Sequence, residues 1–352
     1  MRTGKPVLRL PAENEVGERT IPRQTGLTDR PFLRSMHTRD ASPSVFIVLV
    51  NWNGLADTLE CLESLRSLEY ENFGIVLVDN ASADNSVEAI RGKHPFVRIL
   101  ANPENLGFTG GNNVGIRHAL ENGAAYVWLL NNDTVVDRHA LSRLVEAAEG
   151  DRWIGILGNK IYDSSEPNVL SVAGATIDWT RGTSSHIGRG EVDRGQYDRV
   201  ADVDRVSGCS MLVKREVCEA VGLFDEAFFL FVEDVDWCVR AKRSGFRCVF
   251  VPSSVVWHKE GSSIRKVEQS SLFSYYNTRN FLLLIRKNFV FPEREKLLFH
   301  LICDKMRHRK RTAVKSLFSC LHPPNGVSRS EYAVVCGIRD FLMNRLGKSD
   351  RL

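Results

Sequence analysis

The sequence predicts an α/β fold in which a mostly parallel, Rossmann-like sheet is flanked by helices and followed by a C-terminal helical extension. Two observations predict this fold. Short apolar runs rich in β-branched residues alternate with stretches whose leucines recur at helical spacing, and polar residues directly follow several of the runs. Uninterrupted apolar runs are typical of strands buried on both faces of a parallel sheet, whose connections are right-handed crossovers.

The first part of the chain divides into a leader and a regular series of elements. Residues 1–43 carry five prolines and many charges without periodicity, which predicts a disordered leader. The strands expected after it lie at 45–50, 75–78, 97–100 and 126–130, and the helices between them at 55–65, 87–91 and 116–120.

The rest of the chain is less regular. We expect short strands and loops over 155–190, extended segments at 206–213 and 248–251, and helices at 236–244 and 271–287. The predicted boundaries are 1–43 for the leader, 44–290 for the main domain with halves 44–150 and 151–290, and 291–352 for the helical C-terminal extension.

Composition narrows the class of protein. The chain has 352 residues and a net charge of +4, which is too small to imply a nucleic-acid partner. It shows no apolar signal-peptide region and no apolar run near the ~18 residues that a membrane-spanning helix needs. Its eight cysteines include no CxxC pair, so we expect reduced thiols and a cytoplasmic protein.

Polar clusters follow three of the predicted strands: 51–53, Asp79 with Asn80, and 131–133. Ligands of α/β sheets bind beyond the carboxyl ends of the strands, so we expect one binding cleft there. Asp133 fits a ligand of a hard divalent cation, which prefers oxygen donors, and the alternative is a turn or N-cap residue. Asp79 fits a hydrogen-bond acceptor for a base or a ribose, or an Asx turn.

A glycine-rich stretch precedes the third predicted helix. Gly107, Gly110 and Gly111 are expected in a loop whose backbone amides approach a ligand closely. The spacing matches neither the GxGxxG fingerprint nor a Walker A loop, so the stretch alone is a weak motif.

Three carboxylates, at Glu233, Asp234 and Asp236, come directly after a phenylalanine-rich run. Neighbouring like charges and apolar surroundings raise the pKa of a carboxyl group, as is often found for a general base. We therefore take Asp234 as the candidate base and Glu233 as its supporting neighbour. The alternative is that the carboxylates only cap a helix, and Asp236 fits this role best, paired with Arg240 at helical spacing.

Two further side chains are candidates on their position alone. His258 ends an apolar extended run, where a neutral imidazole fits a metal ligand or a buried structural residue. Arg279 lies in a predicted helix and fits either a contact to a diphosphate or a structural ion pair.

Together these motifs resemble those of the family 2 glycosyltransferases with the GT-A fold, rhamnosyltransferase-like members above all, over roughly residues 44–290. The motifs that carry the resemblance are, in order, Asn51-Trp52-Asn53, Val78-Asp79-Asn80, Asn105 to Phe108, Asn131-Asn132-Asp133, Gly208 to Leu212, Glu233-Asp234 with Asp236 and Arg240, and His258.

The resemblance implies roles for single residues. Asp234 matches the catalytic base with Glu233 beside it, while Asp133 and His258 match ligands of a divalent cation, Mg²⁺ or Mn²⁺. The family's Asp-X-Asp triplet reads Asn-Asn-Asp here, so metal binding is expected to depend on the substrate's phosphates. The residues implied for the nucleotide sugar are Val50, Asn51, Asn53, Asp79, Asn105, Gly107, Asn131, Asn132, Asp133 and Arg279.

The resemblance also implies the reaction: an inverting transfer of rhamnose or another hexose from a dTDP- or UDP-linked donor to a glycan or polyprenyl-linked acceptor of a cell-surface polysaccharide. Two alternatives stay open, a non-catalytic nucleotide-sugar or glycan-binding protein on this fold and a sugar nucleotidyltransferase. The joint presence of Asp133, Asp234 and His258 argues against the first. The lack of a basic residue at 51–54 argues against the second.

The C-terminal third mixes apolar helical patches with basic residues, most densely at Arg307, Arg309, Lys310 and Arg311. Such a surface fits a peripheral contact with anionic lipids at the inner face of the plasma membrane. It also fits an ordinary helical subdomain whose basic face is solvated.

Overall fold

The computed structural model describes residues 42–259, 270–307 and 327–349. The leader predicted at 1–43 lies outside these ranges except for its last two residues, and so do Arg309, Lys310 and Arg311. The boundaries proposed at 43, 150 and 290 stay predictions.

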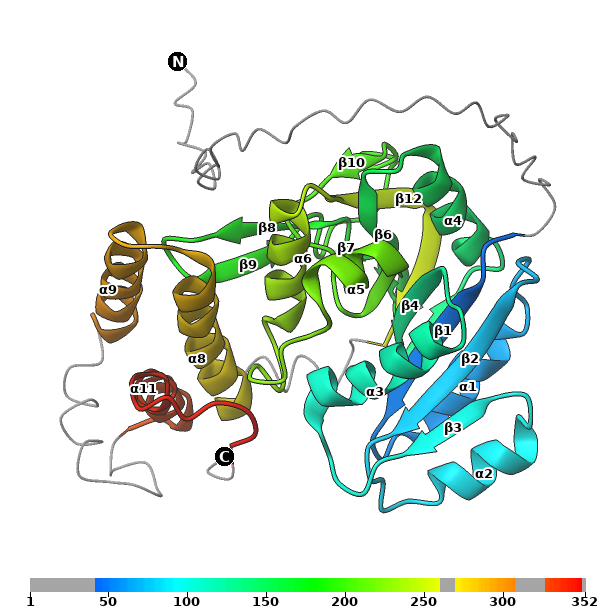
Figure 1. The fold of residues 1–352 in the computed structure, drawn as a ribbon, viewed down its shortest axis with the longest axis horizontal. Helices are drawn as coiled ribbons and strands as arrows, with labels where there is room; N and C mark the ends of the chain where they lie inside the picture. The colour runs from blue at the N-terminus through cyan, green and yellow to red at the C-terminus, as the bar shows by residue number, and fades with distance from the viewer. Residues whose placement is uncertain (1–41, 260–269, 308–326, 350–352) are drawn as a thin grey trace, which may run out of the picture. The chain divides into compact units, whose positions relative to one another are not determined.

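A ten-stranded mixed sheet forms the centre of the fold (Figure 1). Its strands are β1 (Val45–Asn51), β2 (Phe73–Asp79), β3 (Arg98–Ala101), β4 (Tyr126–Asn131), β5 (Thr134–Val136), β6 (Ile154–Asp163), β7 (Glu166–Val172), β10 (Ala201–Asp202), β11 (Ser210–Lys214) and β12 (Arg247–His258). They follow the order β10-β12-β6-β11-β4-β1-β2-β3, with β5 paired to β12 and β7 to β6. A separate hairpin joins β8 (Ala175–Asp178) to β9 (Thr183–His186).

The first four strands are parallel, as the alternating pattern predicts. Strand β11 runs antiparallel to both of its neighbours and so joins the two halves into one sheet. This strand begins at Ser210, later than the 206–213 expected, because 206–209 form a turn. In that turn the Ser210 amide donates to the Ser207 carbonyl at 3.2 Å.

Helices cover both faces of the sheet (Figure 1). They are α1 (Leu55–Leu65), α2 (Ser86–Lys93), α3 (Gly107–Glu121), α4 (Ala140–Gly150), α5 (Arg215–Val221) and α6 (Glu233–Arg243). Residues alternate between the two faces along each strand. In β1, Ile47 and Leu49 pack with α1 and α4, whereas Val48 packs on the face covered by α3, α5 and α6. The helix expected at 236–244 begins earlier, at Glu233.

The glycine loop expected before the third helix is wrong, because α3 already begins at Gly107. The glycines serve close packing on the sheet. A Cβ atom at Gly111 would lie 3.0 Å from Val50 Cγ1, and one at Gly115 would lie 2.3 Å from Val48 Cγ1. Helix α3 therefore lies so close to β1 that only glycine fits at these positions without a shift of the neighbouring side chains.

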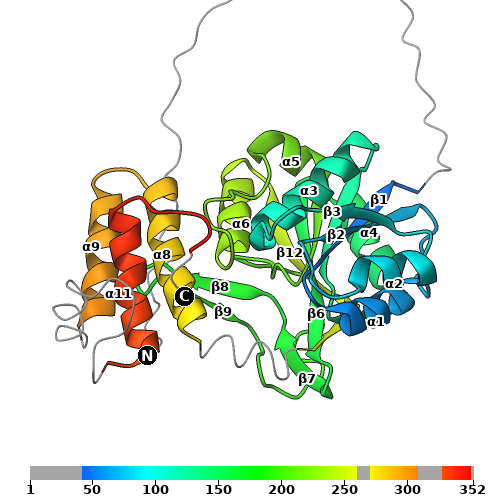
Figure 2. The ribbon, with the colours of Figure 1, turned by 90° about the horizontal axis from the view of Figure 1, so that it is seen from below.

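Three further helices pack together: α8 (Ser271–Asn288), α9 (Glu293–Met306) and α11 (Arg329–Leu342). Figure 2 shows the β8–β9 hairpin extending toward this group. The rings of Trp179 and Phe289 meet edge to face with centroids 4.9 Å apart, and Gly182 lies against Leu301. Within the described ranges, no helix has both the length and the apolar character needed to cross a membrane.

We expect the Gly115→Ala variant to lower the free energy of unfolding by about 1–3 kcal/mol, because the added methyl group clashes with Val48. Gly92→Ala in α2 is the matched control, since nothing lies within 4 Å of its added Cβ. It should be neutral or gain up to about 1 kcal/mol. Urea unfolding of both variants checks this, and equal effects would contradict the packing role of Gly115.

Candidate functional site

The polar residues that end β1, β2 and β4 form one hydrogen-bonded network at the carboxyl edge of the sheet. Asn51 is fully buried, and its Nδ2 donates to Asp79 Oδ1 at 2.9 Å. Its Oδ1 accepts from Thr58 Oγ1 at 3.0 Å. Asn132 Nδ2 joins this pair, 3.3 Å from Asn51 Oδ1 and 2.8 Å from Thr58 Oγ1. The structure thus brings the predicted clusters of three strands together.

Ser82 ties the loops after β1 and β2 to each other. The Asp79 carboxylate accepts hydrogen bonds from the Ser82 amide at 3.0 Å and from the Ser82 hydroxyl at 2.6 Å. These are the bonds of an Asx turn, the alternative expected for Asp79. Asn53 has a left-handed φ of 54°, and its amide donates to Ser82 Oγ at 2.9 Å. The indole of Trp52 is left 58% exposed at this rim. Sequence reasoning named Trp52 only within a motif.

Asn105 and Gly107 shape the start of α3. Asn105 Oδ1 accepts from the Gly107 amide at 2.8 Å, and Gly107 has a left-handed φ of 71°. The next two amides, of Phe108 and Thr109, donate to the Phe229 carbonyl at 2.9 and 3.2 Å. The amides expected to approach a ligand are therefore bonded to the segment that leads into the acidic cluster.

Asp133 and His258 lie side by side although they are 125 residues apart in the sequence. Pairing of β12 with β5 sets His258 opposite Thr134 and brings its Nε2 within 3.0 Å of Asp133 Oδ1. Asn131 Nδ2 lies 3.4 Å from the same nitrogen. His258 is buried, whereas the Asp133 side chain is 24% exposed.

This pair fits two neighbouring ligands of one divalent cation. Donor atoms at about 2.1 Å from an octahedral cation are separated by about 3.0 Å, the distance found between Asp133 Oδ1 and His258 Nε2. Over the described ranges, no group of three or more His, Cys, Asp or Glu side chains that could hold a metal ion is present. Within the described residues, Asp133 and His258 would therefore supply a carboxylate and an imidazole ligand to such a cation.

Asp234 lies in the first turn of α6 and is held from two sides. Its Oδ2 accepts from the Gly208 amide at 3.0 Å and forms an ion pair with the guanidinium of Arg205. Arg205 is also buried, and its Nε donates to Ser184 Oγ at 2.9 Å. Sequence reasoning missed Arg205 because it lies 29 residues from Asp234 and belongs to no motif.

The carboxylates that flank Asp234 have different surroundings. Burial, followed by the charge of Asp234, raises the pKa of Glu233 well above its usual range. Asp236 is fully buried and pairs with Arg240 at 2.7 Å, which confirms the helical pairing expected for it. Asn288 Nδ2 donates to the other Asp236 oxygen at 3.1 Å.

The backbone of residues 227–232, just before α6, is strained, and side chains of α8 hold it through hydrogen bonds to its carbonyl groups. Phe229, Phe231 and Val232 have φ values of 63°, 65° and 73°, a region that costs a residue with a side chain about 1–3 kcal/mol. Asn280 Nδ2 lies 2.8–2.9 Å from the carbonyls of residues 228, 230 and 231. Arg279 donates to the carbonyls of residues 227, 228 and 347 and is only 1% exposed. These contacts hold the backbone in place, but they run to carbonyl groups and not to the acid that a structural ion pair requires.

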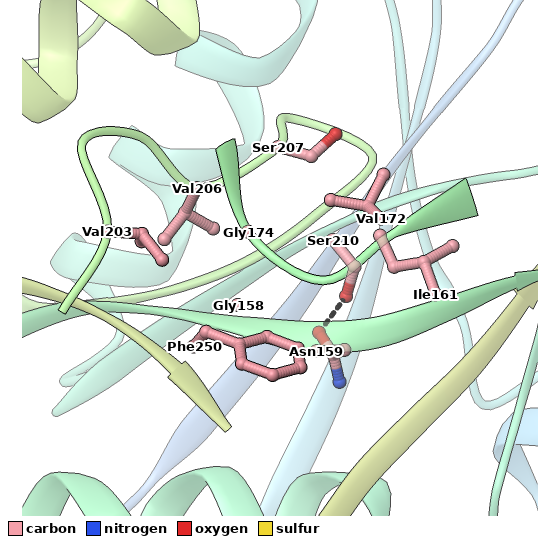
Figure 3. Close-up of a pocket in the computed structure, with 10 residues that line it drawn as sticks. All are labelled: Gly158, Asn159, Ile161, Val172, Gly174, Val203, Val206, Ser207, Ser210 and Phe250. Atoms are coloured by element: carbon pink, nitrogen blue, oxygen red, sulfur yellow. Dashed lines mark hydrogen bonds between the residues drawn. The ribbon is translucent and has the colours of Figure 1, made fainter. Parts of the chain in front are cut away.

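A small cavity lies beneath the turn at 206–209 (Figure 3). Its volume of about 10 Å³ leaves room for about one water molecule. Val203, Val206 and Phe250 line it together with Ser210, whose hydroxyl bonds Asn159 at 2.5 Å. It is a gap in the packing and too small for a substrate.

Comparison with known proteins gives a consistent result. The family described as "Glycosyltransferase like family 2" matches residues 43–277. The dTDP-rhamnosyl transferase RfbF of Shigella flexneri is 25% identical over 253 residues, which are 70% of this chain and 81% of the relative. An N-acetylglucosaminyl-diphospho-decaprenol L-rhamnosyltransferase of Mycobacterium tuberculosis is 28% identical over 245 residues, which are 64% of this chain and 79% of the relative.

Solved structures share the fold at lower identity. The mannosyltransferase PcManGT from Pyrobaculum calidifontis, in complex with GDP-Man and Mn²⁺, matches with a TM-score of 0.53 and 15% identity over 87% of this chain and 89% of its own. S. aureus TarS 1-349 in complex with UDP-GlcNAc matches with a TM-score of 0.54 and 14% identity over 85% and 81%. The predicted fold is thereby confirmed.

We expect Asn280→Ala to lower the free energy of unfolding by about 1–3 kcal/mol, because buried carbonyls of the strained segment lose their donor. Limited proteolysis should then cut within 227–232. Asn122→Ala is the control, since among the described residues the Asn122 side chain makes one hydrogen bond, to the His118 carbonyl at the exposed end of α3. An Asn280→Ala variant as stable and as protease-resistant as this control would rule out the holding role.

Proposed function

Since the chain belongs to glycosyltransferase family 2, with the GT-A fold, and transfers a sugar from a nucleotide sugar, we propose an inverting, metal-dependent hexosyl transfer to a glycan or polyprenyl-linked acceptor. One observation carries this proposal: the turn at Gly208 and Cys209 connects the strand that leads to Asp133 with the proposed base, Asp234. The Gly208 amide bonds Asp234, and the adjacent Cys209 carbonyl accepts from the Asn131 amide at 2.8 Å, two residues before Asp133.

The donor in this proposal is a dTDP- or UDP-linked sugar. The Asn51–Asp79 network offers hydrogen-bonding groups beside the exposed indole of Trp52, whose flat face suits stacking on a base. The names of relatives support the range of donors, since the Shigella relative is a dTDP-rhamnosyl transferase and TarS was solved with UDP-GlcNAc. The acceptor class follows the mycobacterial relative, named for a diphospho-decaprenol substrate.

Asp133 and His258 would hold the divalent cation, Mg²⁺ or Mn²⁺, together with oxygens of the donor diphosphate. When bound, such a cation neutralises the charge that develops on the departing nucleoside diphosphate. The Mn²⁺ in the PcManGT complex supports this assignment. Because two ligands meet here among the described residues, we expect the cation to bind much more tightly with the nucleotide than without it.

The chemical step is a single displacement. The Asp234 carboxylate takes the proton of an acceptor hydroxyl, whose oxygen bonds to the anomeric carbon as the bond to the phosphate oxygen breaks. The electron pair of that bond leaves with the nucleoside diphosphate, and attack from the opposite face inverts the anomeric configuration. The raised pKa of Glu233 disfavours a second negative charge beside the base. General-base assistance supplies about 10²–10⁴-fold, and positioning supplies much of the rest.

Two alternatives to this transfer are testable. A non-catalytic protein of this fold would bind nucleotide sugars or glycans without turnover, and a sugar nucleotidyltransferase would release pyrophosphate from a nucleoside triphosphate. Incubating the protein with dTDP- and UDP-sugars, with and without Mg²⁺ or Mn²⁺, separates the three. Release of the nucleoside diphosphate that depends on the metal supports transfer. Binding without turnover, or consumption of a triphosphate, would favour one of the alternatives.

In that assay we expect Asp234→Asn to lower turnover by at least the ~10²-fold that a general base supplies, with nucleotide affinity within a few-fold of wild type. The amide keeps the shape of the side chain and removes its basic oxygen. Glu88→Gln on the exposed face of α2 is the control and should keep full turnover. Turnover near wild type in a folded Asp234→Asn protein would refute the assignment of the base.

We also propose peripheral contact with anionic lipid through the C-terminal helices. Phe291, at the corner between α8 and α9, is 74% exposed, and Phe299 on α9 is 73% exposed. Lys296 and Arg307 lie on the same exposed face as Phe299, at i−3 and i+8. Apolar side chains beside cations suit the boundary between headgroups and acyl chains.

We expect the protein to sediment with vesicles of phosphatidylcholine and phosphatidylglycerol at low salt. Most of it should stay in the supernatant at ~0.5 M salt, because screening weakens the charge attraction. Phe291→Ser with Phe299→Ser should reduce binding. Phe96→Ser, which changes an exposed phenylalanine before β3, should not. Equal binding to vesicles without the anionic lipid would reject this contact.

A further inference from the structure

We propose that Arg205 is a positioning residue for the transfer reaction: its guanidinium balances the charge of the Asp234 carboxylate and turns one carboxylate oxygen toward the acceptor. The proposal rests on the function proposed above, in which Asp234 is the base. It concerns a residue outside the motifs of the sequence, held in place by the β8–β9 hairpin.

The hydrogen bonds of Asp234 divide unequally between its two oxygens. Oδ2 takes both the Arg205 guanidinium and the Gly208 amide, and these two donors occupy its lone pairs. Oδ1 accepts one bond among the described residues, from the Val235 amide at 2.8 Å. A carboxylate oxygen accepts two such bonds, so Oδ1 keeps the lone pair that an acceptor hydroxyl needs.

Contacts outside the ion pair hold Arg205 in place. Its Nε donates to Ser184 Oγ at 2.9 Å, and its backbone forms a bridge with Ala175. Ser184 belongs to β9 and Ala175 to β8, so both anchors are in the hairpin. Ser184 Oγ in turn donates to the Thr176 carbonyl at 2.9 Å. The hairpin therefore sets where the guanidinium lies and, through it, how the carboxylate is turned.

The charges around this ion pair leave Arg205 as its main cation. Burial and then the charge of Asp234 raise the pKa of Glu233, the neighbour of Asp234 on α6. His186 on β9 is neutral, because burial and then the charge of Arg205 lower its pKa to about 3, with Arg189 and His258 adding to the effect. Asp236 faces Arg240 and Asn288 instead.

The side chains of Arg205 and Asp234 are 8% and 10% exposed, so water screens their attraction weakly. Without the guanidinium, a buried carboxylate beside a second acid takes up a proton more readily. The protonated acid is no longer a base. Loss of Arg205 should therefore matter most at low pH, which a purely structural role does not predict.

The test measures kcat/KM from pH 5 to 9 for Arg205→Met and Arg205→Lys, using the nucleotide sugar that the donor screen selects. In the methionine variant we expect the acidic limb of the pH profile of kcat/KM to shift to higher pH by about 1–3 units, with partial recovery of activity above pH 8. The lysine variant keeps the charge, so its limb should stay in place while kcat falls several-fold. Ser184→Ala should behave like the lysine variant.

Arg247→Met is the matched control, because Arg247 pairs with Asp151 and Asp202, away from the proposed base, and its loss should leave the limb unchanged. A folded methionine variant that loses the same factor at every pH would overturn the proposal. If that variant fails to unfold cooperatively, Arg205→Gln replaces it under the same criteria. If neither folds, unchanged kcat in both Arg205→Lys and Ser184→Ala overturns the proposal.

The two proposals fail in different ways. If Asp234→Asn keeps its turnover, the assignment of the base is wrong and Arg205 has nothing to position. If Asp234→Asn is inactive but the acidic limb of the charge-free Arg205 variant stays where it is in wild type, only the role of Arg205 is wrong.

Discussion

The site depends on one set of hydrogen bonds, those that Asn280 and Arg279 of α8 donate to the carbonyls of residues 227–231. Three nearby residues with left-handed backbone each cost about 1–3 kcal/mol, and single hydrogen bonds return about 1 kcal/mol apiece. No single bond offsets this strain, so the conformation of the segment depends on several of these bonds together. Because Glu233 and Asp234 follow directly, a C-terminal helix determines where the first turn of α6 begins.

The same segment is held from the other side by helix α3. The first amides of α3 donate to the Phe229 carbonyl, and the glycines of α3 let this helix lie directly against β1. The polar ends of the parallel strands and the acidic cluster are thus joined through α3 as well as through the turn at 208–209. Two segments more than 100 residues apart along the chain are part of one constellation.

Three neighbouring acids acquire three different states from their surroundings. Glu233 is buried beside a negative charge, which raises its pKa, Asp234 is paired with Arg205, and Asp236 is tied to Arg240 and Asn288. The partners of the last two come from other elements or from the next helical turn. A cluster of acids is therefore not a shared site in itself, since each environment decides what its acid can do.

The sequence by itself determined the parallel strands, most of the helices and the edge at which Asn51, Asp79 and Asp133 meet. These features follow from local periodicity and from the rule that the carboxyl ends of parallel strands share an edge. Only the tertiary structure decided that the glycines lie inside α3, that Arg279 is buried, and that Arg205 pairs with Asp234. Each of these depends on how closely two distant segments approach, and a one-dimensional pattern does not contain that distance.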